Sequence, residues 1–381
     1  MEWKTVKISD IGRVVTGKTP STKNPDYYEN GDILFVGPSD LNSCIKYIHS
    51  SEKHITQEGL KSLGNNTIPQ GAICVSCIGT IGYVGISPFD CATNQQINSI
   101  VVNDGIDRDF VYYTMRNMWS VFKSLEGQST TLSILNKGQF SNLEISLPPL
   151  ETQRRIAEFL SSLDDKIENN NRINRNLEAQ AQALFKSWFV DFEPWGGIMP
   201  EDWREGNLLD VAELFDNKRI PLSGMQRDSM EKIYPYYGAT SIMDYVDNYL
   251  FDGVYLLMGE DGSVMTDNGF PYLQYVEGKF WCNNHAHIMQ GRKGYSTEML
   301  YCLLSRTNVS GIVTGAVQGK ISQTAMKKIS VVIPPTQICK NLADKMDIIF
   351  KAIRRYRRES SRLAALRDTL LPKLMKGEIA V

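Results

Sequence analysis

The feature that most constrains this chain is an internal repeat. Shifting the sequence by 186 positions aligns Leu147-Pro148-Pro149 with Ile333-Pro334-Pro335, and the match continues without a gap for about forty residues. A shift of 200 positions aligns the two beginnings, where Trp3 meets Trp203 and Asp10 meets Asp210. Self-similarity at a fixed offset is the signature of a duplicated unit. The sequence therefore predicts two copies of one structural plan.

Each copy begins with a segment of mixed character. Short strand-like runs are separated by Gly, Pro, Asn and Ser, as in a small sheet-containing domain. One helix per copy is predicted, from Asp107 to about Leu125 and from Ser296 to about Leu304, because each run follows a residue that caps helices well. Both front segments are thus predicted to be α+β. The clearest strand-like runs are Asp32 to Val36, Ala72 to Ile78, Gly253 to Met258 and Ile329 to Ile333.

A different pattern follows each Pro-Pro pair. The segment from Thr152 to Phe189 contains neither Gly nor Pro, and its apolar residues recur at heptad spacing. Eight of ten seam positions are apolar in this copy, and eight of ten in the other. Each copy is therefore predicted to end in a helix of about 38 residues and ~57 Å, which needs a coiled-coil partner.

The simplest partner for each long helix is the other one. Only the short segment from Asp191 to Asp202 separates the first helix from the second domain, so the second helix can return antiparallel along the first. The predicted fold is two pseudo-repeated mixed α/β domains separated by two long antiparallel coiled-coil helices, with pseudo-twofold symmetry. Asn170 would then face Ser360 across the seam. The alternative is that each helix pairs with the same helix of a second chain.

Composition excludes several classes of protein. With 42% apolar and 22% charged residues, and no apolar run near the length of a membrane span, the chain is typical of a soluble cytoplasmic protein. Seven scattered cysteines are an odd number, so a disulfide framework is not expected. Cys74 and Cys77 form a C-x-x-C without a second pair of ligands, which does not predict a metal site.

Charge is unevenly distributed along the chain. Residues 1–147 carry 12 basic and 14 acidic residues, and residues 191–333 carry 12 and 18, whereas residues 336–381 carry 11 and 5. A nucleic-acid ligand would therefore have to meet local basic loops, or partners that close around it. The basic cluster at 351–358 fits either a solvated helix face or a surface that touches DNA or a partner.

Several motifs, taken in their order along the chain, resemble the specificity (S) subunit of type I restriction-modification enzymes. The resemblance covers nearly the whole sequence. Copy two departs from copy one at Ile333 to Lys340, which lacks the Glu-x-Gln-Arg-Arg run. The motifs are Gly79-Thr80-Ile81-Gly82, Asn94-Gln95-Gln96 and Leu147 to Ala157 in copy one, and Tyr234 to Ala239, Gly259 to Ser263 and Asn283 to His287 in copy two.

This resemblance implies a non-catalytic reader of double-stranded DNA. Two target-recognition domains would each read one half of a bipartite, asymmetric site, and the helices would set the gap between the halves. Two methyltransferase (M) subunits and two motor-nuclease (R) subunits would dock on the chain. They would bring S-adenosylmethionine, ATP and Mg, while this chain would bind no cofactor and no metal.

The expected organisation follows from the repeat and the resemblance together. It is target-recognition domain 1 at 1–151, the first spacer helix at 152–190, a linker at 191–202, target-recognition domain 2 at 203–335, and the second spacer helix with the C-terminal tail at 336–381.

Polar side chains able to hydrogen-bond base edges, and those near the Pro-Pro junction and the first helix, supply the candidate contacts. The aromatic group is predicted to pack the first helix onto the second domain, with its outer edge as an alternative partner surface. The DNA-binding candidates are Thr16, Lys18, Thr19, Lys23, Asn94, Gln95 and Gln96 in the first domain, and Lys218, Arg219, Tyr237, Asn283, Asn284, His285, Arg292 and Lys293 in the second. The partner-binding candidates are Gln153, Arg154, Arg155, Phe185, Trp188 and Phe189.

One different function competes with this interpretation. The run from Gly12 to Thr19 fits the P-loop pattern G-x-x-x-x-G-K-[ST], so the alternative is a P-loop nucleotide hydrolase with a coiled-coil arm. A P-loop needs a helix that starts at the lysine, and Pro20 follows at once, which favours a polar loop. For the segment from Cys282 to His287, a turn and strand that hydrogen-bond locally or read a base are the favoured interpretation. A small metal site of Cys282, His285 and His287 is the weaker one.

Overall fold

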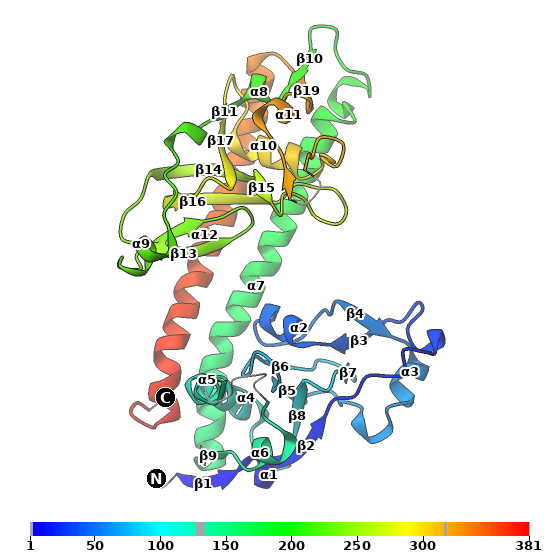
Figure 1. Ribbon diagram of the computed structural model, residues 1–381, viewed down its shortest axis with the longest axis vertical. Coiled ribbons are helices and arrows are strands. Elements are labelled where there is room, and N and C mark those ends of the chain that lie inside the picture. Colours follow the sequence, from blue (N-terminus) through cyan, green and yellow to red (C-terminus); the bar gives the residue numbers. More distant parts are fainter. Residues whose placement is uncertain (1–2, 127–133, 316–317, 381) are drawn as a thin grey trace. The chain divides into compact units, whose positions relative to one another are not determined.

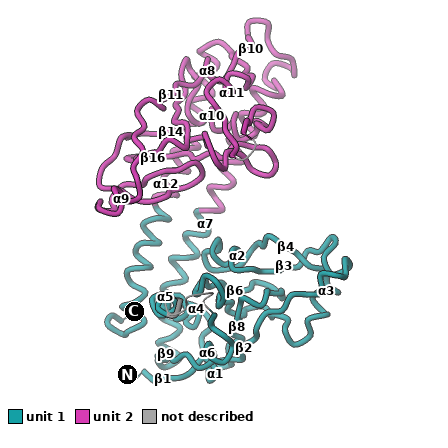
Figure 2. Tube along the Cα trace, in the orientation of Figure 1, with its two compact units in different colours: residues 1–170, 359–381 teal, residues 171–358 magenta. Residues whose placement is uncertain are grey.

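A computed structural model describes residues 3–126, 134–315 and 318–380, and the chain divides into two compact units (Figures 1 and 2). Unit 1 comprises Met1–Asn170 and Glu359–Val381, and unit 2 comprises Asn171–Arg358. Residues 1–2 and 381, at the ends of the predicted first and last segments, lie outside the described residues.

The described residues of unit 1 form three small sheets. Strands β2-β8-β5-β6 form a four-stranded sheet, β4-β3-β7 a three-stranded sheet, and β1 pairs with β9. The predicted strands at 32–36 and 72–78 are confirmed. The strands are β1 (Lys4–Lys7), β2 (Gly12–Thr16), β3 (Ile33–Val36), β4 (Lys53–Ile55), β5 (Ile73–Ser76), β6 (Val84–Ile86), β7 (Ala92–Thr93), β8 (Ile97–Val102) and β9 (Glu144–Leu147).

Short helices cover these sheets. The helix predicted from Asp107 to Leu125 is two helices, because α4 ends at Asn117 and α5 restarts at Trp119. The Asp107 side chain accepts a hydrogen bond from the Phe110 N–H, as a capping residue should. The short helical elements of unit 1 are α1 (Ile8–Ile11), η1 (Pro25–Tyr27), α2 (Pro38–Ser43), α3 (Gln57–Lys61), η2 (Gly64–Asn66), α4 (Arg108–Asn117), α5 (Trp119–Glu126) and α6 (Lys137–Ser141).

Unit 2 is organised around one six-stranded sheet, with the order β11-β17-β14-β16-β12-β13. Unit 2 also contains two separate strand pairs among its described residues, β10-β19 and β15-β18. The predicted strands at 253–258 and 329–333 are confirmed. The strands are β10 (Arg204–Asn207), β11 (Ala212–Leu214), β12 (Tyr234–Tyr237), β13 (Ile242–Val246), β14 (Phe251–Gly259), β15 (Asp261–Gly262), β16 (Leu273–Cys282), β17 (Ala286–Gly291), β18 (Gly319–Lys320) and β19 (Ser330–Ile333).

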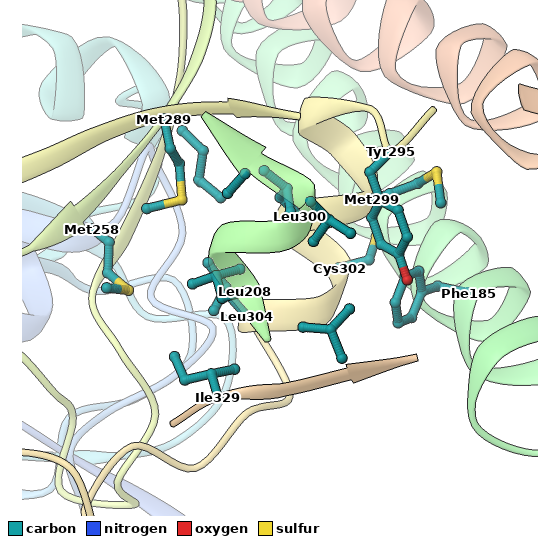
Figure 3. Packing of buried hydrophobic residues seen from close by; sticks show 14 of the residues in the cluster. Phe185, Leu208, Met258, Met289, Tyr295, Met299, Leu300, Cys302, Leu304 and Ile329 are labelled. Carbon is teal, nitrogen blue, oxygen red and sulfur yellow. The ribbon is translucent and has the colours of Figure 1, made fainter. Parts of the chain in front are cut away.

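The predicted helix at 296–304 is α10, and Ser296 caps it by accepting from the Met299 N–H. This helix packs on β14 and β17, and its residues belong to the main core of unit 2 (Figure 3). The helical elements of unit 2 are η3 (Glu193–Trp195), α8 (Leu208–Val211), η4 (Asp216–Lys218), α9 (Gly224–Asp228), α10 (Thr297–Leu304) and α11 (Gln323–Met326).

The two predicted long helices are α7 (Leu150–Phe189) and α12 (Thr336–Met375), each of 40 residues. They pack antiparallel within this one chain. In unit 1 the Asn170 amide donates to Glu359 at 3.1 Å, and in unit 2 Arg357 donates to Glu178 at 2.7 Å. Asn170 thus lies beside the sequence neighbour of Ser360, and the predicted antiparallel packing of the two helices within one chain is confirmed.

The packing of α7 against α12 in unit 1 includes a buried ion pair that heptad analysis does not predict. Asp164 is 0% exposed, and it accepts hydrogen bonds from the Tyr113 hydroxyl at 2.7 Å and from the Arg367 guanidinium at 2.5 Å. The seam residue that the heptad predicts, Leu163, is only half-buried. The buried face is shifted because α4 also packs against this stretch of α7.

No helix in the described part of the chain combines the length and the apolar character needed to cross a bilayer. All seven cysteines are free thiols, and Cys74 and Cys77 are buried in the core of unit 1.

Candidate nucleic-acid interface

In unit 1 the structure brings together most of the residues predicted to read DNA. The Thr16 hydroxyl donates to the Asn98 side chain at 2.7 Å, and the Thr19 hydroxyl donates to the Gln95 side chain at 2.9 Å. The end of β2 therefore lies against the loop that precedes β8. Lys18 and Gln95 are exposed there.

The loop before β8 holds its shape through its own side chains. Asn94 accepts a hydrogen bond from the Gln96 backbone N–H at 3.0 Å, and its amide donates to the Gln96 side chain at 2.9 Å. These side-chain bonds fix the loop. The exposed Gln95 between them is left as the residue most available to a ligand.

Gly17 permits the close approach of these two segments. A Cβ atom at this position would lie 2.1 Å from the Asn94 carbonyl oxygen and 2.2 Å from the Thr93 hydroxyl. No side chain fits in that space. The glycine that suggested a phosphate-binding loop is thus required for packing.

The P-loop alternative is wrong. Residues Gly12–Thr16 form β2, which pairs antiparallel with β8, and the next helical element is the short 3₁₀ turn η1 at Pro25–Tyr27. No helix N-terminus meets Lys18, so the arrangement that cradles phosphate is missing from this described segment.

In unit 2 the corresponding segments also meet. The Asn283 N–H donates to the Tyr237 carbonyl at 3.0 Å, and Asn283 accepts from the His285 N–H at 2.8 Å. His285 is half-exposed and pairs with Asp261. Asn284 is exposed at the tip of this loop.

Arg219 has a structural role that differs from the predicted one. Its side chain is only 12% exposed, and its Nη1 donates to the Ala286 carbonyl at 2.7 Å and to Glu260 at 2.6 Å. These bonds hold the loop that carries Asn284 in place. Arg219 supports the candidate surface from behind, whereas the adjacent Lys218 is exposed.

A buried polar cluster lies behind the same loop. The His287 side chain, 1% exposed, contacts Asp216 through Nδ1 at 2.6 Å and the Ile321 carbonyl through Nε2 at 2.7 Å. Glu260 is 3.6 Å from the same Nδ1. Burial lowers the pKa of His287, but the hydrogen bond and charge of Asp216, with the Ile321 carbonyl, outweigh burial and raise this pKa above 6.5.

The same contacts act on the other partner in the opposite sense. Burial raises the pKa of Asp216, but the hydrogen bond and charge of His287 outweigh it and lower this pKa below 3.8. Both shifts favour the charged forms, so the contacts stabilise an imidazolium–carboxylate pair. Arg219 and Lys320 pair with Glu260 at 2.6 and 3.7 Å, so basic side chains also flank the two carboxylates.

This cluster does not favour a metal ion. Asp216, Glu260 and His287 offer ligand atoms within 4.8 Å of one another. Both nitrogens of His287 are already hydrogen-bonded, and a guanidinium occupies the position beside the carboxylates. The weaker interpretation of Cys282, His285 and His287 as metal ligands is not supported either, because His285 pairs with Asp261 instead.

Arg292 and Lys293 lie away from the other candidates of unit 2. They follow the C-terminal end of β17, whereas Asn283 and His285 precede its N-terminal end. Both are exposed, and the Arg292 guanidinium bonds the carbonyls of Leu209 and Asp210. The structure therefore does not unite this basic pair with the loop at 283–285.

Lys23, in unit 1, is exposed beyond the Thr16–Thr19 loop.

Three of the predicted partner-binding residues are part of the interior. Gln153 is 2% exposed, and its side chain bonds the Asp107 N–H at 2.9 Å and the Pro148 carbonyl at 2.8 Å. Phe185 and Phe189 lie in the core of unit 2, where Phe185 packs near Tyr295 (Figure 3). These three residues stabilise the units and offer no surface to a partner.

The other three partner-binding candidates remain accessible. Arg154 and Arg155 are exposed on the first turns of α7. Trp188 is half-buried, with its ring 5.5 Å from that of Trp195.

Most of the basic cluster at 351–358 is engaged inside unit 2. Arg354 is buried and bonds Tyr275 and Glu298, the latter at 3.2 Å. Arg357 pairs with Glu178 and Arg358 pairs with Glu277. The interpretation of the whole cluster as a solvated face is therefore wrong for Arg354.

Sequence reasoning missed the bonds made behind the two loops. Asn98, Asp216 and His287, with the half-buried Glu260, join separate segments there, whereas the sequence suggested only a metal ligand for His287. The repeat is the signal that could have related two of these residues. Aligning Asn94-Gln95-Gln96 with Asn283-Asn284-His285 places Asn98 on His287.

Comparison with known proteins gives a consistent result. The family model described as "Type I restriction modification DNA specificity domain" matches residues 1–179 and 200–361. The chain is 31% identical over 423 residues to the type I restriction enzyme MjaIX specificity subunit of Methanocaldococcus jannaschii, covering 100% of this chain and 94% of that protein.

More distant relatives span the chain as well. The type I restriction enzyme EcoprrI specificity subunit of Escherichia coli is 21% identical over 384 residues, covering 96% of this chain and 92% of the relative. In fold, the chain is similar to the crystal structure of the type I restriction-modification system S subunit from M. genitalium. That match has a TM-score of 0.57 at 18% identity, and it covers 98% of this chain and 96% of the other.

Proposed function

The chain belongs to the specificity subunits of type I restriction-modification systems, a non-catalytic family, and from that premise we propose that it reads a bipartite, asymmetric site in double-stranded DNA. Each unit reads one half of the site. The long helices set the number of unread base pairs between the halves.

The observation that carries this proposal is made once in each unit: two segments that are far apart in the sequence lie together and expose polar side chains. In unit 1 the exposed side chains of Lys18 and Gln95 project from two segments held together by Gly17 and the Thr19–Gln95 bond. In unit 2 the exposed Lys218 and Asn284 project from two segments held together by Arg219. Lysine suits phosphate, and amide side chains suit base edges. A duplicated surface of this kind fits a ligand with two different halves.

The residues proposed to contact DNA follow from this geometry. Arg219 acts from behind the loop, and Arg292 and Lys293 are proposed to contact the DNA backbone apart from the base-reading loop. The base-reading set is Thr16, Thr19, Asn94, Gln95 and Gln96 in unit 1 and Tyr237, Asn284 and His285 in unit 2. Lys18, Lys23 and Lys218 are proposed as phosphate contacts. Asn283 is 3% exposed and supports the loop through its bond with the His285 N–H.

The proposed complex contains two methyltransferase (M) subunits and two motor-nuclease (R) subunits around one copy of this chain. Those subunits supply S-adenosylmethionine, ATP and Mg, and this chain supplies DNA sequence recognition. Arg154, Arg155 and the exposed edge of Trp188 are the proposed M-subunit contacts. We retain the predicted organisation, with target-recognition domains at 1–151 and 203–335.

The most direct functional test is co-expression with the methyltransferase subunit encoded beside this gene, followed by genome-wide mapping of methylated adenines. We expect a motif with two defined halves and a fixed gap. The purified chain alone should show no methyltransferase, ATPase or nuclease turnover. An uninterrupted motif, or turnover that depends on residues of this chain, would contradict the proposal.

Lengthening α7 tests whether the helices set the gap. Inserting four residues after Asn176 adds about one turn, or about 6 Å, against about 3.4 Å per base pair of DNA. We expect the preferred gap to grow by about one or two base pairs, while both half-site sequences stay the same. Binding is measured on duplexes whose gap varies by single base pairs. An unchanged optimum with uniformly lower affinity would show that the helices do not set the spacing.

A further inference from the structure

Unit 2 contains a buried side chain that joins three segments of the proposed DNA-reading surface. His287 lies on β17, directly after the loop that carries Asn283, Asn284 and His285. One ring nitrogen contacts Asp216, at the start of the η4 segment that carries Lys218, and the other bonds the Ile321 carbonyl after β18. The imidazole thus connects the two segments that bear the exposed candidates to a third segment.

Unit 1 contains a side chain with the same connections. Asn98 lies on β8, after the loop that carries Asn94, Gln95 and Gln96. Its carbonyl oxygen accepts from the Thr16 hydroxyl at 2.7 Å, and its amide donates to the Leu135 carbonyl at 3.3 Å. Asn98 is 3% exposed, so this bridge is also interior.

The backbone around the two bridges matches bond for bond. In unit 1 the Cys77 N–H donates to the Gln96 carbonyl at 2.7 Å, and the Leu135 N–H donates to the Cys77 carbonyl at 2.8 Å. In unit 2 the Glu260 N–H donates to the His285 carbonyl, and the Ile321 N–H donates to the Glu260 carbonyl, both at 2.8 Å. Asn98 and His287 therefore occupy equivalent places in the repeat.

We propose that Asn98 and His287 are equivalent positioning residues, each of which fixes the DNA-reading loops of its own unit, and that only the bridge in unit 2 responds to pH. This inference rests on the proposed function, and it adds which buried side chain fixes the DNA-reading loops of each unit. The Asn98–Thr16 bridge is neutral at every physiological pH. The His287–Asp216 bridge joins two titratable groups.

The proton on His287 decides whether the unit 2 bridge holds. The Ile321 carbonyl can only accept, so Nε2 carries a hydrogen, and a neutral ring would then point the Nδ1 lone pair at the Asp216 carboxylate. Loss of the second proton replaces an attraction with a repulsion in a buried site. The charged and titratable groups around this imidazole are Asp216 of η4, Glu260 after β14, Arg219 after η4, Lys320 of β18 and the Asp261–His285 pair.

The direction of the pH effect follows from the two pKa shifts. The raised pKa of His287 makes its contribution complete below about 6.5, and the contribution is lost as pH rises through the folded-state pKa. The lowered pKa of Asp216 makes its contribution complete above 3.8, and that contribution is lost only as pH falls through a still lower value. Unit 2 should therefore hold its loops below the folded-state pKa of His287 and release them as pH rises above it.

The test uses the chain assembled with its methyltransferase subunits and three duplexes: the mapped target, a duplex altered in the half read by unit 1, and one altered in the half read by unit 2. Affinities are measured from pH 5.5 to 9.5, and each half is scored as the ratio of target affinity to altered-duplex affinity. For the wild-type chain we expect the unit 2 ratio to fall about tenfold or more toward high pH. The unit 1 ratio should stay constant.

Exchanging the bridge separates positioning from simple folding. The double variant Asp216→Thr with His287→Asn installs the neutral pair of unit 1, and we expect it to keep its preference for the unit 2 half while losing the pH dependence. His287→Ala should lose the unit 2 preference at every pH, and Asn98→Ala should lose the unit 1 preference instead. His54→Asn, the same change at an exposed position on β4, is the matched control and should behave as wild type.

Each result has a distinct consequence. A unit 2 ratio that is constant with pH in the wild-type chain, or an exchange variant that keeps the wild-type pH profile, would overturn the inference while leaving the proposed function intact. If neither altered duplex binds more weakly than the target, the proposed function fails, and this inference fails with it.

Discussion

Replacing Arg367 with alanine is expected to lower the free energy of unfolding by about 3–5 kcal/mol. The substitution removes the guanidinium that pairs with Asp164 at 2.5 Å, and the fully buried carboxylate then keeps the Tyr113 hydroxyl as its one hydrogen-bond donor among the described residues. Burial of an uncompensated charge is among the most destabilising changes a protein can undergo. The free energy of unfolding is measured by urea titration, and hydrogen exchange of the unit 1 amides shows whether the loss of stability lies in unit 1.

Two comparisons make this prediction specific. Arg362→Ala removes an exposed arginine from the same helix and should change stability by less than about 0.5 kcal/mol. The pair Asp164→Leu with Arg367→Met removes both charges and should recover most of the loss. The repeat supports this recovery, since the equivalent positions in unit 2 are Phe350 and Ala181, both buried and apolar. An Arg367→Ala variant as stable as the wild type would contradict this account of the buried pair.

Replacing Phe189 with alanine should destabilise unit 2 by about 3–5 kcal/mol. Its ring is 4% exposed and lies 5.7 Å from both Trp203 and Tyr295, so truncation leaves a cavity in the core. The free energy of unfolding is measured as for Arg367→Ala. Phe89→Ala, at a ring position that is 68% exposed, is the matched control and should be nearly neutral.

This second substitution also separates two roles for the aromatic residues of α7. If Phe189→Ala were as stable as the wild type and yet failed to bind the methyltransferase subunit, the residue would be a partner contact after all. If Phe189 is a core residue, the variant is less stable than the wild type, and any loss of binding results from that loss of stability.

The fold could be predicted from the sequence to the extent that it depends on the repeat. The two long helices followed from heptad periodicity, their antiparallel packing from the short connection at 191–202, and one capped helix start per copy from the capping residues Asp107 and Ser296. The heptad was less informative about which face is buried. It selects Leu163, whereas Asp164 is the fully buried residue, because α4 packs beside the coiled coil and widens the buried face.

The candidate site was less predictable because residue type does not show which way a polar side chain points. Arg219 and Lys218 are adjacent cations, yet one is turned inward to bond Glu260 and the Ala286 carbonyl while the other is exposed. Likewise, the sequence does not indicate a partner for His287, whereas in the fold its Nδ1 lies 2.6 Å from the Asp216 carboxylate. Such pairs join residues about 70 positions apart, and a single sequence carries no signal for them.

The central claim is that the two units read different halves of one DNA site independently, and a domain exchange tests it most directly. Residues 1–147 are replaced by the same segment of a relative with a different target, and methylated adenines are mapped after co-expression with the methyltransferase subunit. We predict that one half of the motif changes to that of the relative while the other half and the gap remain as in the wild type. A motif altered in both halves, or in neither, would contradict the account.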